Sequence, residues 1–173
     1  MLDVACGTGI FLSQLLGLLP DLEAYGIDAS ADMLAQARAL LASFPQVRLE
    51  QVELATSERA RLPYAPATFD LITCTNALHG LPDPVGMLVE SRRLLAPGGQ
   101  LVLEDIARGP SLFLGKAFEC VARLVVGRSV HVSTLTEAQE LAREAGLRLE
   151  CAKAFRIDWL LRGWGLRAQD AFS

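Results

Sequence analysis

The stretch LDVACGTGI, residues 2–10, joins a short apolar run to a glycine turn and then to an apolar helical pattern. Leu2–Ala5 predicts a strand, and Gly7 and Gly9 predict a turn in which the backbone can come close to a ligand. The amides that open the following helix favour negative or lone-pair-rich groups. The stretch therefore predicts a strand–turn–helix unit that holds a nucleotide-like ligand.

Short apolar runs alternate with helical ones along the whole chain, which is typical of a parallel sheet covered on both faces. The expected strands are 2–5, 23–27, 47–52, 69–74, 100–106, 147–155 and 164–168. The expected helices are 10–19, 30–42 with Ser30 as N-cap, 84–95, and 136–145 with Thr136 as N-cap. In the second helix, one apolar stripe is expected from Met33, Leu34, Ala37, Leu40 and Leu41. We expect one α/β domain over residues 1–173, because no repeat or linker divides the pattern.

Composition and cysteine spacing argue against a nucleic-acid partner, a zinc site, a disulfide framework and a membrane span. Of the 173 residues, 51% are hydrophobic and 21% are charged, and the formal net charge of -4 disfavours a nucleic-acid partner. The cysteines are scattered without a C-x-x-C pair, so we expect buried thiols and neither a zinc site nor a disulfide framework at Cys6, Cys74, Cys120 and Cys151. No signal peptide or bilayer-length apolar run is seen, which predicts a cytoplasmic protein without stable membrane insertion.

Asp28 and Leu12 narrow the choice of ligand. Asp28 ends the second expected strand, where an acid in a doubly wound sheet accepts hydrogen bonds from ribose hydroxyls. The dinucleotide fingerprint G-x-G-x-x-G needs a third glycine at position 12, which is Leu12, and Asp3 inside the first strand is also foreign to it. The ligand is therefore expected to carry a ribose but no pyrophosphate.

With these residues the chain resembles the class I S-adenosylmethionine-dependent methyltransferases, and most closely the ubiquinone- and menaquinone-biosynthesis-like group that acts on small molecules. Four ordered stretches carry the resemblance: LDVACGTG, YGIDASADMLAQAR, LPYAPATFDLITCTNALHGLPDP and LLAPGGQLVLED. It implies a Rossmann-like, doubly wound three-layer sandwich with a seven-stranded sheet of order 3-2-1-4-5-7-6 and an antiparallel last strand. It also implies S-adenosylmethionine as the cofactor.

The resemblance implies roles for individual residues. Asp3 and the backbone of Ala5, Cys6, Gly7, Thr8 and Gly9 would surround the methionine part of the cofactor. Asp28 would hold the ribose, Ala29 and Met33 would flank the adenine, and Asn76 would face the methionine end or the methyl group. The loop after the third strand departs from the family pattern, and its candidates for the adenine amino group are Glu53, Thr56, Ser57 and Glu58.

Two histidines are candidates for a catalytic base. His79 follows the fourth expected strand near the ligand-binding edge of the sheet, where an imidazole could take a proton from a substrate hydroxyl, but a structural role in the loop is favoured over this one. His131 lies in an apolar helical insertion over residues 107–135, which we expect to be a substrate lid or a homodimer contact rather than a membrane-surface helix. Two histidines without spaced acids predict no metal site.

The sequence thus predicts methyl transfer from S-adenosylmethionine to a small, fairly apolar acceptor, and the absence of an NPPY-type motif after the fourth strand favours oxygen or carbon over an amino group. An inactive cofactor-binding or interaction module of the same fold is the alternative, because fold does not fix function. A nicotinamide-dependent oxidoreductase is a weaker alternative, since Leu12 opposes it. The helices that usually precede the first strand in relatives are not found before Leu2.

Overall fold

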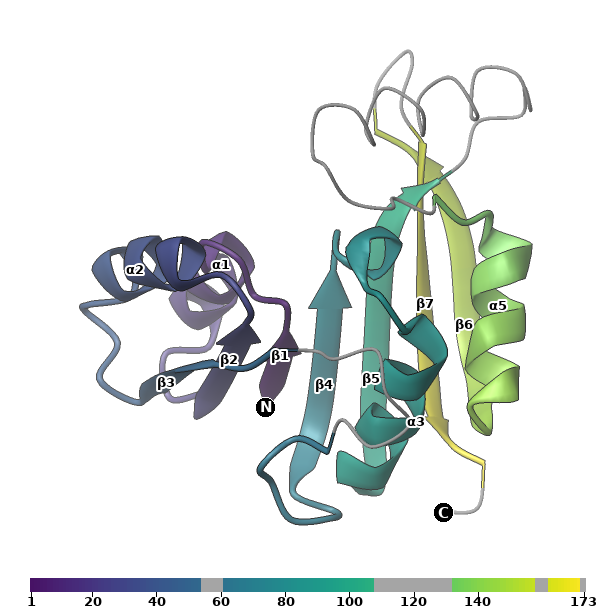
Figure 1. Ribbon diagram of the computed structural model, residues 1–173, viewed down its shortest axis with the longest axis horizontal. Coiled ribbons are helices and arrows are strands. Elements are labelled where there is room, and N and C mark those ends of the chain that lie inside the picture. Colours follow the sequence, from purple (N-terminus) through teal and green to yellow (C-terminus); the bar gives the residue numbers. More distant parts are fainter. Residues whose placement is uncertain (54–60, 108–131, 158–161, 172–173) are drawn as a thin grey trace.

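The computed structural model describes residues 1–53, 61–107, 132–157 and 162–171. Its seven strands form one sheet in the order β3-β2-β1-β4-β5-β7-β6 (Figure 1). The strands are β1 (Leu2–Val4), β2 (Ala24–Asp28), β3 (Val47–Gln51), β4 (Phe69–Thr75), β5 (Leu95–Ala107), β6 (Leu147–Arg156) and β7 (Arg162–Asp170). All neighbouring pairs are parallel except those of β7, which runs antiparallel to β5 and β6. The expected doubly wound, Rossmann-like sheet is confirmed.

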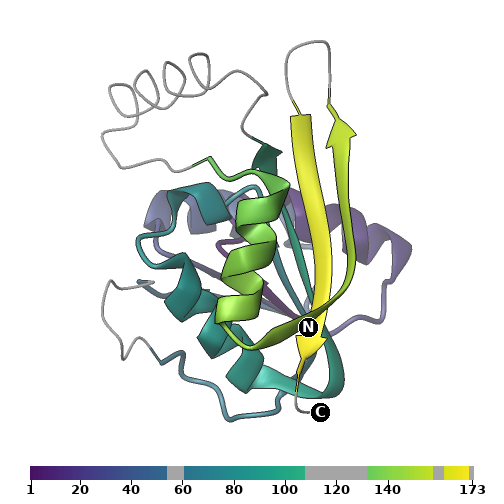
Figure 2. The same cartoon turned by 90° about the vertical axis from the view of Figure 1, so that its right-hand side faces the viewer.

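Helices cover the two faces of this sheet. They are α1 (Ile10–Leu18), α2 (Ala31–Leu40), the 3-10 helix η1 (Leu78–Gly80), α3 (Pro84–Leu94) and α5 (Leu135–Glu144). Figure 2 shows α3 and α5 side by side on one face. The strand alternation gives each face its own core: Ile27 of β2 belongs to the larger one with α3 and α5, and Ala24 to the smaller one with α1 and α2.

The apolar stripe expected on α2 is only partly buried. Leu34 and Ala37 are fully buried and Leu41 is nearly so, because these residues face α1 and β3. Met33 and Leu40 were wrongly placed in the stripe, since they are 42% and 45% exposed. Ser30 does cap the helix, as its hydroxyl accepts a hydrogen bond from the Met33 amide at 3.3 Å.

The N-cap of α5 is Thr134 rather than the expected Thr136. The Thr134 hydroxyl accepts a hydrogen bond from the Glu137 amide, and the Glu137 carboxylate accepts one from the Thr134 amide. Thr136 stands in the same pattern before Gln139, so the pattern alone does not choose between the two threonines; the helix already begins at Leu135, which places Thr136 inside its first turn. The C-terminal prediction is confirmed, because Gly146 follows the helix with a φ of 77°.

The fifth strand begins earlier than expected. Leu95 already pairs with Phe69, and the register then shifts so that Gln100 pairs with Leu71. The Pro97–Gly99 turn is therefore an irregularity within β5 and not a loop before it. A β-bulge of this kind keeps two strands paired while the local backbone bends.

Two further expectations concern exposure and membrane contact. Cys6 and Cys74 are buried as expected, but Cys151 is exposed because it lies on β6, a strand at the edge of the sheet. Cys120, His131 and residues 108–131 of the expected insertion lie outside the described residues. Among the described helices, none is long and apolar enough to cross a membrane.

Candidate cofactor site

The turn after β1 is built from backbone in the left-handed region. Ala5, Gly7 and Gly9 have φ values of 56°, 55° and 77°. The Gly9 amide donates to the Cys6 carbonyl at 3.0 Å, and the Cys6 amide donates to the Ile27 carbonyl at 2.9 Å, which ties the turn to β2. Non-glycine residues rarely adopt this region, so Ala5 holds a strained conformation at the entrance to the turn.

The two glycines of the turn have different roles. A Cβ added at Gly7 would meet no atom within 4 Å, so this part of the backbone faces open space that a ligand can approach. A Cβ at Gly9 would lie 2.9 Å from a methyl carbon of Leu41 and 3.2 Å from the Cβ of Ala37. Gly9 therefore allows α1 and α2 to pack closely, and Gly7 is the glycine that a ligand can reach.

Asp28, at the carboxyl end of β2, holds the turn in place. Its Oδ2 accepts a hydrogen bond from the Gly7 amide at 2.8 Å, and its Oδ1 accepts one from the Ser30 amide at 2.9 Å. Each carboxylate oxygen keeps a further lone pair, so these contacts leave acceptor capacity for the hydroxyls of a ribose. Asp28 thus fixes the geometry of the site and is also suited to the ligand-binding role expected of it.

Asp3 is a buried acid with an unmet hydrogen-bonding need. The residue is 1% exposed, and its Oδ1 accepts a hydrogen bond from the Thr73 hydroxyl at 2.6 Å. Its Oδ2 is buried without a hydrogen-bond partner in the described structure. Burial raises the pKa of Asp3 to about 7; the Thr73 bond opposes this rise and the charge of Asp28 adds to it. A buried carboxylate beside an open glycine turn suits a ligand that brings a cation or N–H donors.

The Cys6 thiol is affected by the charges of both acids and is poorly suited to act as a nucleophile. Burial and the charges of Asp3 and Asp28 raise its pKa to about 12. The thiolate is therefore scarce at neutral pH, and Cys6 contributes backbone and packing to the turn.

Other residues expected at the site follow the carboxyl ends of neighbouring parallel strands. Ala29 follows β2, and its carbonyl accepts a hydrogen bond from the Gln51 side chain at 3.0 Å. Met33 lies in the first turn of α2 and Glu53 just after β3; both are exposed. Asn76 follows β4 with a φ of 51°, and its backbone amide donates a hydrogen bond to the Glu104 carbonyl at 2.7 Å. These residues share the sheet edge at which doubly wound folds bind their ligands.

His79 is bound to an acid that was not expected at the site. Its Nδ1 lies 2.7 Å from Oδ1 of Asp105, and its backbone amide donates to Oδ2 of Asp105 at 2.8 Å. Asp105 lies near the carboxyl end of β5 and is 1% exposed. The hydrogen bond to Asp105 raises the pKa of His79; burial opposes this rise and the negative charge of Asp105 adds to it.

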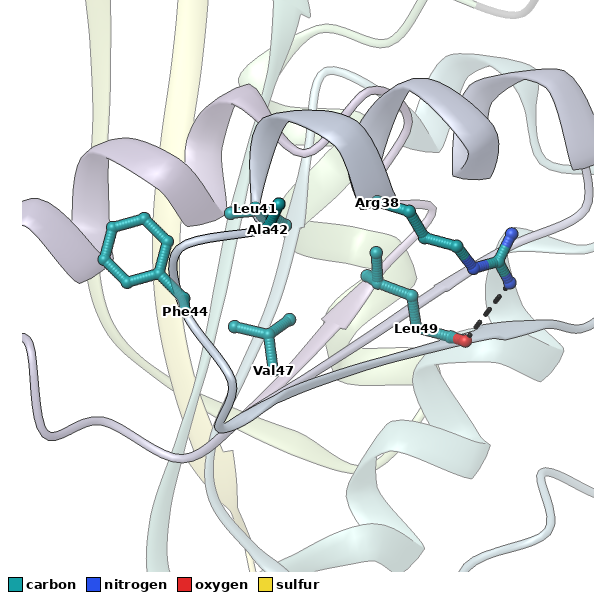
Figure 3. A pocket seen from close by; sticks show the side chains of 6 residues that line it. All are labelled: Arg38, Leu41, Ala42, Phe44, Val47 and Leu49. Carbon is teal, nitrogen blue, oxygen red and sulfur yellow. Dashed lines mark hydrogen bonds between the residues drawn. The ribbon is translucent and has the colours of Figure 1, made fainter.

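A separate hollow lies at the outer edge of the sheet, between the end of α2 and β3. It has a volume of about 270 Å³ and is lined by Arg38, Leu41, Ala42, Phe44, Val47 and Leu49. Figure 3 shows its one charged group, the Arg38 guanidinium, turned to the Leu49 carbonyl at 3.4 Å. None of the expected cofactor residues lines this hollow. Within the described parts of the chain, no group of three His, Cys, Asp or Glu side chains has an arrangement that could hold a metal ion.

The sequence predictions missed two residues that complete these contacts. Thr73 lies opposite Asp3 in the β1–β4 register, and Asp105 follows the apolar run of β5. An acid at the end of a strand was a readable signal for Asp105. The partnership of Thr73 with Asp3 depends on the strand order, since β4 is distant from β1 in the sequence but adjacent in the sheet.

Comparison with known proteins shows the family of the chain. Residues 2–101 match the family model of the methyltransferase domain. The chain is 34% identical over 158 residues to "Ubiquinone biosynthesis O-methyltransferase" of Xanthomonas euvesicatoria pv. vesicatoria, covering 87% of this chain and 63% of that protein. It is 36% identical over 102 residues to "Demethylmenaquinone methyltransferase" of Bacillus mycoides, covering 58% of this chain and 42% of that protein. The chain thus spans less than two thirds of the length of these curated relatives.

A solved structure has the same fold. The crystal structure of a candidate methyltransferase from Bacillus halodurans C-125 superposes with a TM-score of 0.75 at 26% identity, covering 89% of this chain and 64% of that one. The family model, the curated relatives and the sheet order agree with one another. The chain belongs to the class I S-adenosylmethionine-dependent methyltransferases and falls in the group similar to the quinone-biosynthesis enzymes.

Proposed function

We propose that this chain transfers the methyl group of S-adenosylmethionine to oxygen or carbon of a small, fairly apolar acceptor. The observation that carries the proposal is the partnerless Oδ2 of buried Asp3 on β1, the strand that leads into a turn where the backbone of Gly7 faces open space. The cofactor has an amino-acid ammonium group whose positive charge the Asp3 carboxylate would attract, and ribose hydroxyls that can donate to Asp28. The names of the curated relatives, which refer to quinone biosynthesis, support an apolar aromatic acceptor.

The bound cofactor supplies an activated methyl group, so the chain's task is to hold the donor and the acceptor in line. Asp3, Gly7 and Asp28 would fix the donor, and the edge beyond β4 and β5 would place the acceptor. Correct alignment of two reactants can lower a barrier by roughly 7–11 kcal/mol, which is large enough to account for catalysis without a nucleophilic residue. We also propose that residues 107–135 cover the acceptor or contact a second copy of the chain.

A turnover assay tests the proposal. The purified chain is incubated with S-adenosylmethionine carrying a labelled methyl group and with an alkylcatechol or a reduced naphthoquinone, and label in the acceptor is measured against S-adenosylhomocysteine formed. We expect equal amounts of both products. Asp28→Asn should reduce turnover by weakening cofactor binding, while Asp21→Asn, at an exposed acid between α1 and β2, should not. Tight cofactor binding without labelled product from any acceptor would favour an inactive module and contradict the proposal.

A further inference from the structure

The hollow between the end of α2 and β3 has room for a small ligand. Its volume is about 270 Å³, and none of the expected cofactor residues lines it. A cavity of roughly 150 Å³ that is lined by Leu, Ile and Phe side chains can hold a benzene ring. The hollow can therefore accommodate one aromatic ring or branched alkyl group together with a short substituent.

Most of the wall of this hollow is apolar. Figure 3 shows around it the side chains of Leu41 and Phe44, from the turn after α2, and of Val47 and Leu49, from β3. Leu41 is 4% exposed, whereas Phe44, Val47 and Leu49 are only partly buried, so part of the apolar wall still contacts water. A ligand with an apolar body would cover that surface, which favours binding.

Arg38 is the one charged residue that lines the hollow, and it is exposed. Its Nη2 donates to the Leu49 carbonyl at 3.4 Å, which is longer than the usual range of about 2.7–3.2 Å for such a bond. Within the described structure, Arg38 forms no ion pair with an acid. Its place in the last turn of α2 suits a cation and leaves the guanidinium able to donate two parallel hydrogen bonds to a carboxylate.

Two residues of the wall also pack against backbone that shapes the glycine turn. A Cβ added at Gly9 would lie 2.9 Å from a methyl carbon of Leu41. A Cβ added at Gly26 of β2 would lie 2.8 Å from a methyl carbon of Leu49 and 3.0 Å from Sγ of Cys6. A ligand that restrains Leu41 and Leu49 therefore restrains side chains that lie directly against the turn and the strand beside it.

We propose that this hollow is a second binding site, for a small carboxylate with an aromatic or branched aliphatic body, and that its occupation strengthens cofactor binding at the turn. The carboxylate pairs with Arg38, and the apolar body lies among Leu41, Phe44 and Val47. A neutral apolar molecule would leave the Arg38 charge unpaired, and an inorganic anion would leave the apolar wall in water. Binding in the hollow goes beyond the proposed function, whereas the effect on the cofactor rests on it.

A nuclear magnetic resonance titration locates the site without any need for activity. The chain is labelled at its Leu and Val methyl groups and titrated with 4-methylbenzoate. We expect the methyl signals of Leu41, Val47 and Leu49 to shift with a Kd of roughly 0.1–1 mM, in keeping with a ligand of about ten non-hydrogen atoms. The neutral 4-methylbenzamide and the small anion acetate should each bind at least about 10-fold more weakly, because each lacks one of the two kinds of contact.

Three variants test the assigned contacts. Arg38→Gln removes the charge and should weaken 4-methylbenzoate binding at least about 10-fold. Arg48→Gln is the matched control, because Arg48 is also an exposed arginine at this edge but lies over the Tyr25 ring, 5.4 Å from its centroid, on the other face of β3. Ala42→Leu places a larger side chain in the wall and should block binding; since Ala42 is exposed, this variant should fold normally.

The effect on the turn has a readout that needs no cofactor. The backbone amides of Cys6 and Gly9 donate to the carbonyls of Ile27 and Cys6, so their hydrogen exchange reports how well the turn is ordered. Saturating 4-methylbenzoate should slow this exchange and raise the calorimetric affinity for S-adenosylhomocysteine about 5-fold. Neither change is expected in Arg38→Gln.

Several results would overturn the site itself. An absence of methyl shifts, or shifts confined to other methyl groups, would show that the ligand does not enter the hollow, and equal affinity for acetate would show that the apolar wall plays no part. Competition between 4-methylbenzoate and S-adenosylhomocysteine would place the carboxylate in the cofactor site instead. Shifts of the same methyl signals when the ligand-free chain is concentrated would show that a second copy covers the hollow.

Two other results separate the remaining parts of the account. Unchanged hydrogen exchange and unchanged cofactor affinity at saturating 4-methylbenzoate would overturn the effect on the turn. If the wild-type chain binds no S-adenosylhomocysteine, the proposed function fails, while the titration and the exchange measurement still decide whether the hollow is a binding site.

Discussion

Replacing Asp3 by asparagine should stabilise the free protein and weaken its cofactor site. The Asp3 side chain is 1% exposed, and its Oδ2 has no partner in the described structure. Asparagine has nearly the same shape and keeps an oxygen that can accept the 2.6 Å hydrogen bond from Thr73. The main change is therefore the loss of a negative charge that the fold holds out of water.

The sign and size of the effect follow from the raised pKa of Asp3. Its value of about 7 in the folded chain lies above the value of about 3.9 expected when the chain is unfolded. The folded state therefore holds a proton that the unfolded state has lost, and stability falls as the pH rises from about 4 to about 7. Three pKa units correspond to roughly 4 kcal/mol. The unpaired amide of asparagine costs about 1–3 kcal/mol, which leaves a net gain of roughly 1–3 kcal/mol above pH 7.

Urea denaturation of both proteins at pH 5 and pH 8 measures this gain. We expect Asp3→Asn to be more stable than wild type at pH 8 and to lose that advantage at pH 5, where Asp3 is largely protonated in the folded chain. Added S-adenosylhomocysteine should stabilise wild type far more than the variant. Equal destabilisation by Asp3→Asn at both pH values would refute the view that the buried negative charge of Asp3 destabilises the free protein.

Two paired substitutions test other parts of the account. Gly9→Ala should lower the unfolding free energy by about 2–4 kcal/mol, because it adds backbone strain and a clash with Leu41. Gly7→Ala should lower it by only the strain of about 1–2 kcal/mol, but it should weaken cofactor binding more than Gly9→Ala does. Thermal denaturation and calorimetry separate the two effects, and equal losses of stability would contradict the different roles of the two glycines. Thr134→Ala should lower stability by about 1 kcal/mol and Thr136→Ala by much less, since only Thr134 caps α5; denaturation curves that rank them in the opposite order would contradict the capping assignment.

Much of the fold could be predicted from local patterns. The strand–turn–helix at residues 2–18 and the alternation of strands with helices needed only periodicity, glycines and caps. The errors concern residues whose burial or strand pairing depends on distant parts of the chain. Met33 and Leu40 have the period of buried residues, but no described element covers them, and the early start of β5 depends on pairing with Phe69.

A motif indicated the candidate site residues after β1 and β2, whereas the contacts that depend on strand order could not be predicted from the sequence. Asp28 was expected from its place at the end of β2; the structure adds its bond to the Gly7 amide, and its contact with a ribose stays a prediction. Thr73 was missed because its partner Asp3 is far away in the sequence. Asp105 was marked by its place near the end of a strand, but its contact with His79 could not be read from the sequence. Tertiary structure therefore adds polar contacts that shift the pKa of both groups: the contact with Asp105 raises that of His79, and the contact with Thr73 opposes the rise that burial causes in Asp3.

The most direct test of the central claim is calorimetric titration of the wild-type chain with S-adenosylmethionine at pH 6.5, repeated in buffers of different ionisation enthalpy. If the positive charge of the bound cofactor stabilises the carboxylate of Asp3, Asp3 must be ionised in the complex. Binding should then release up to about one proton, that of Asp3, and the affinity should rise as the pH rises towards 8. Asp3→Asn should abolish the proton release. No binding of S-adenosylmethionine, binding of NADH in its place, or binding without proton release would contradict the account.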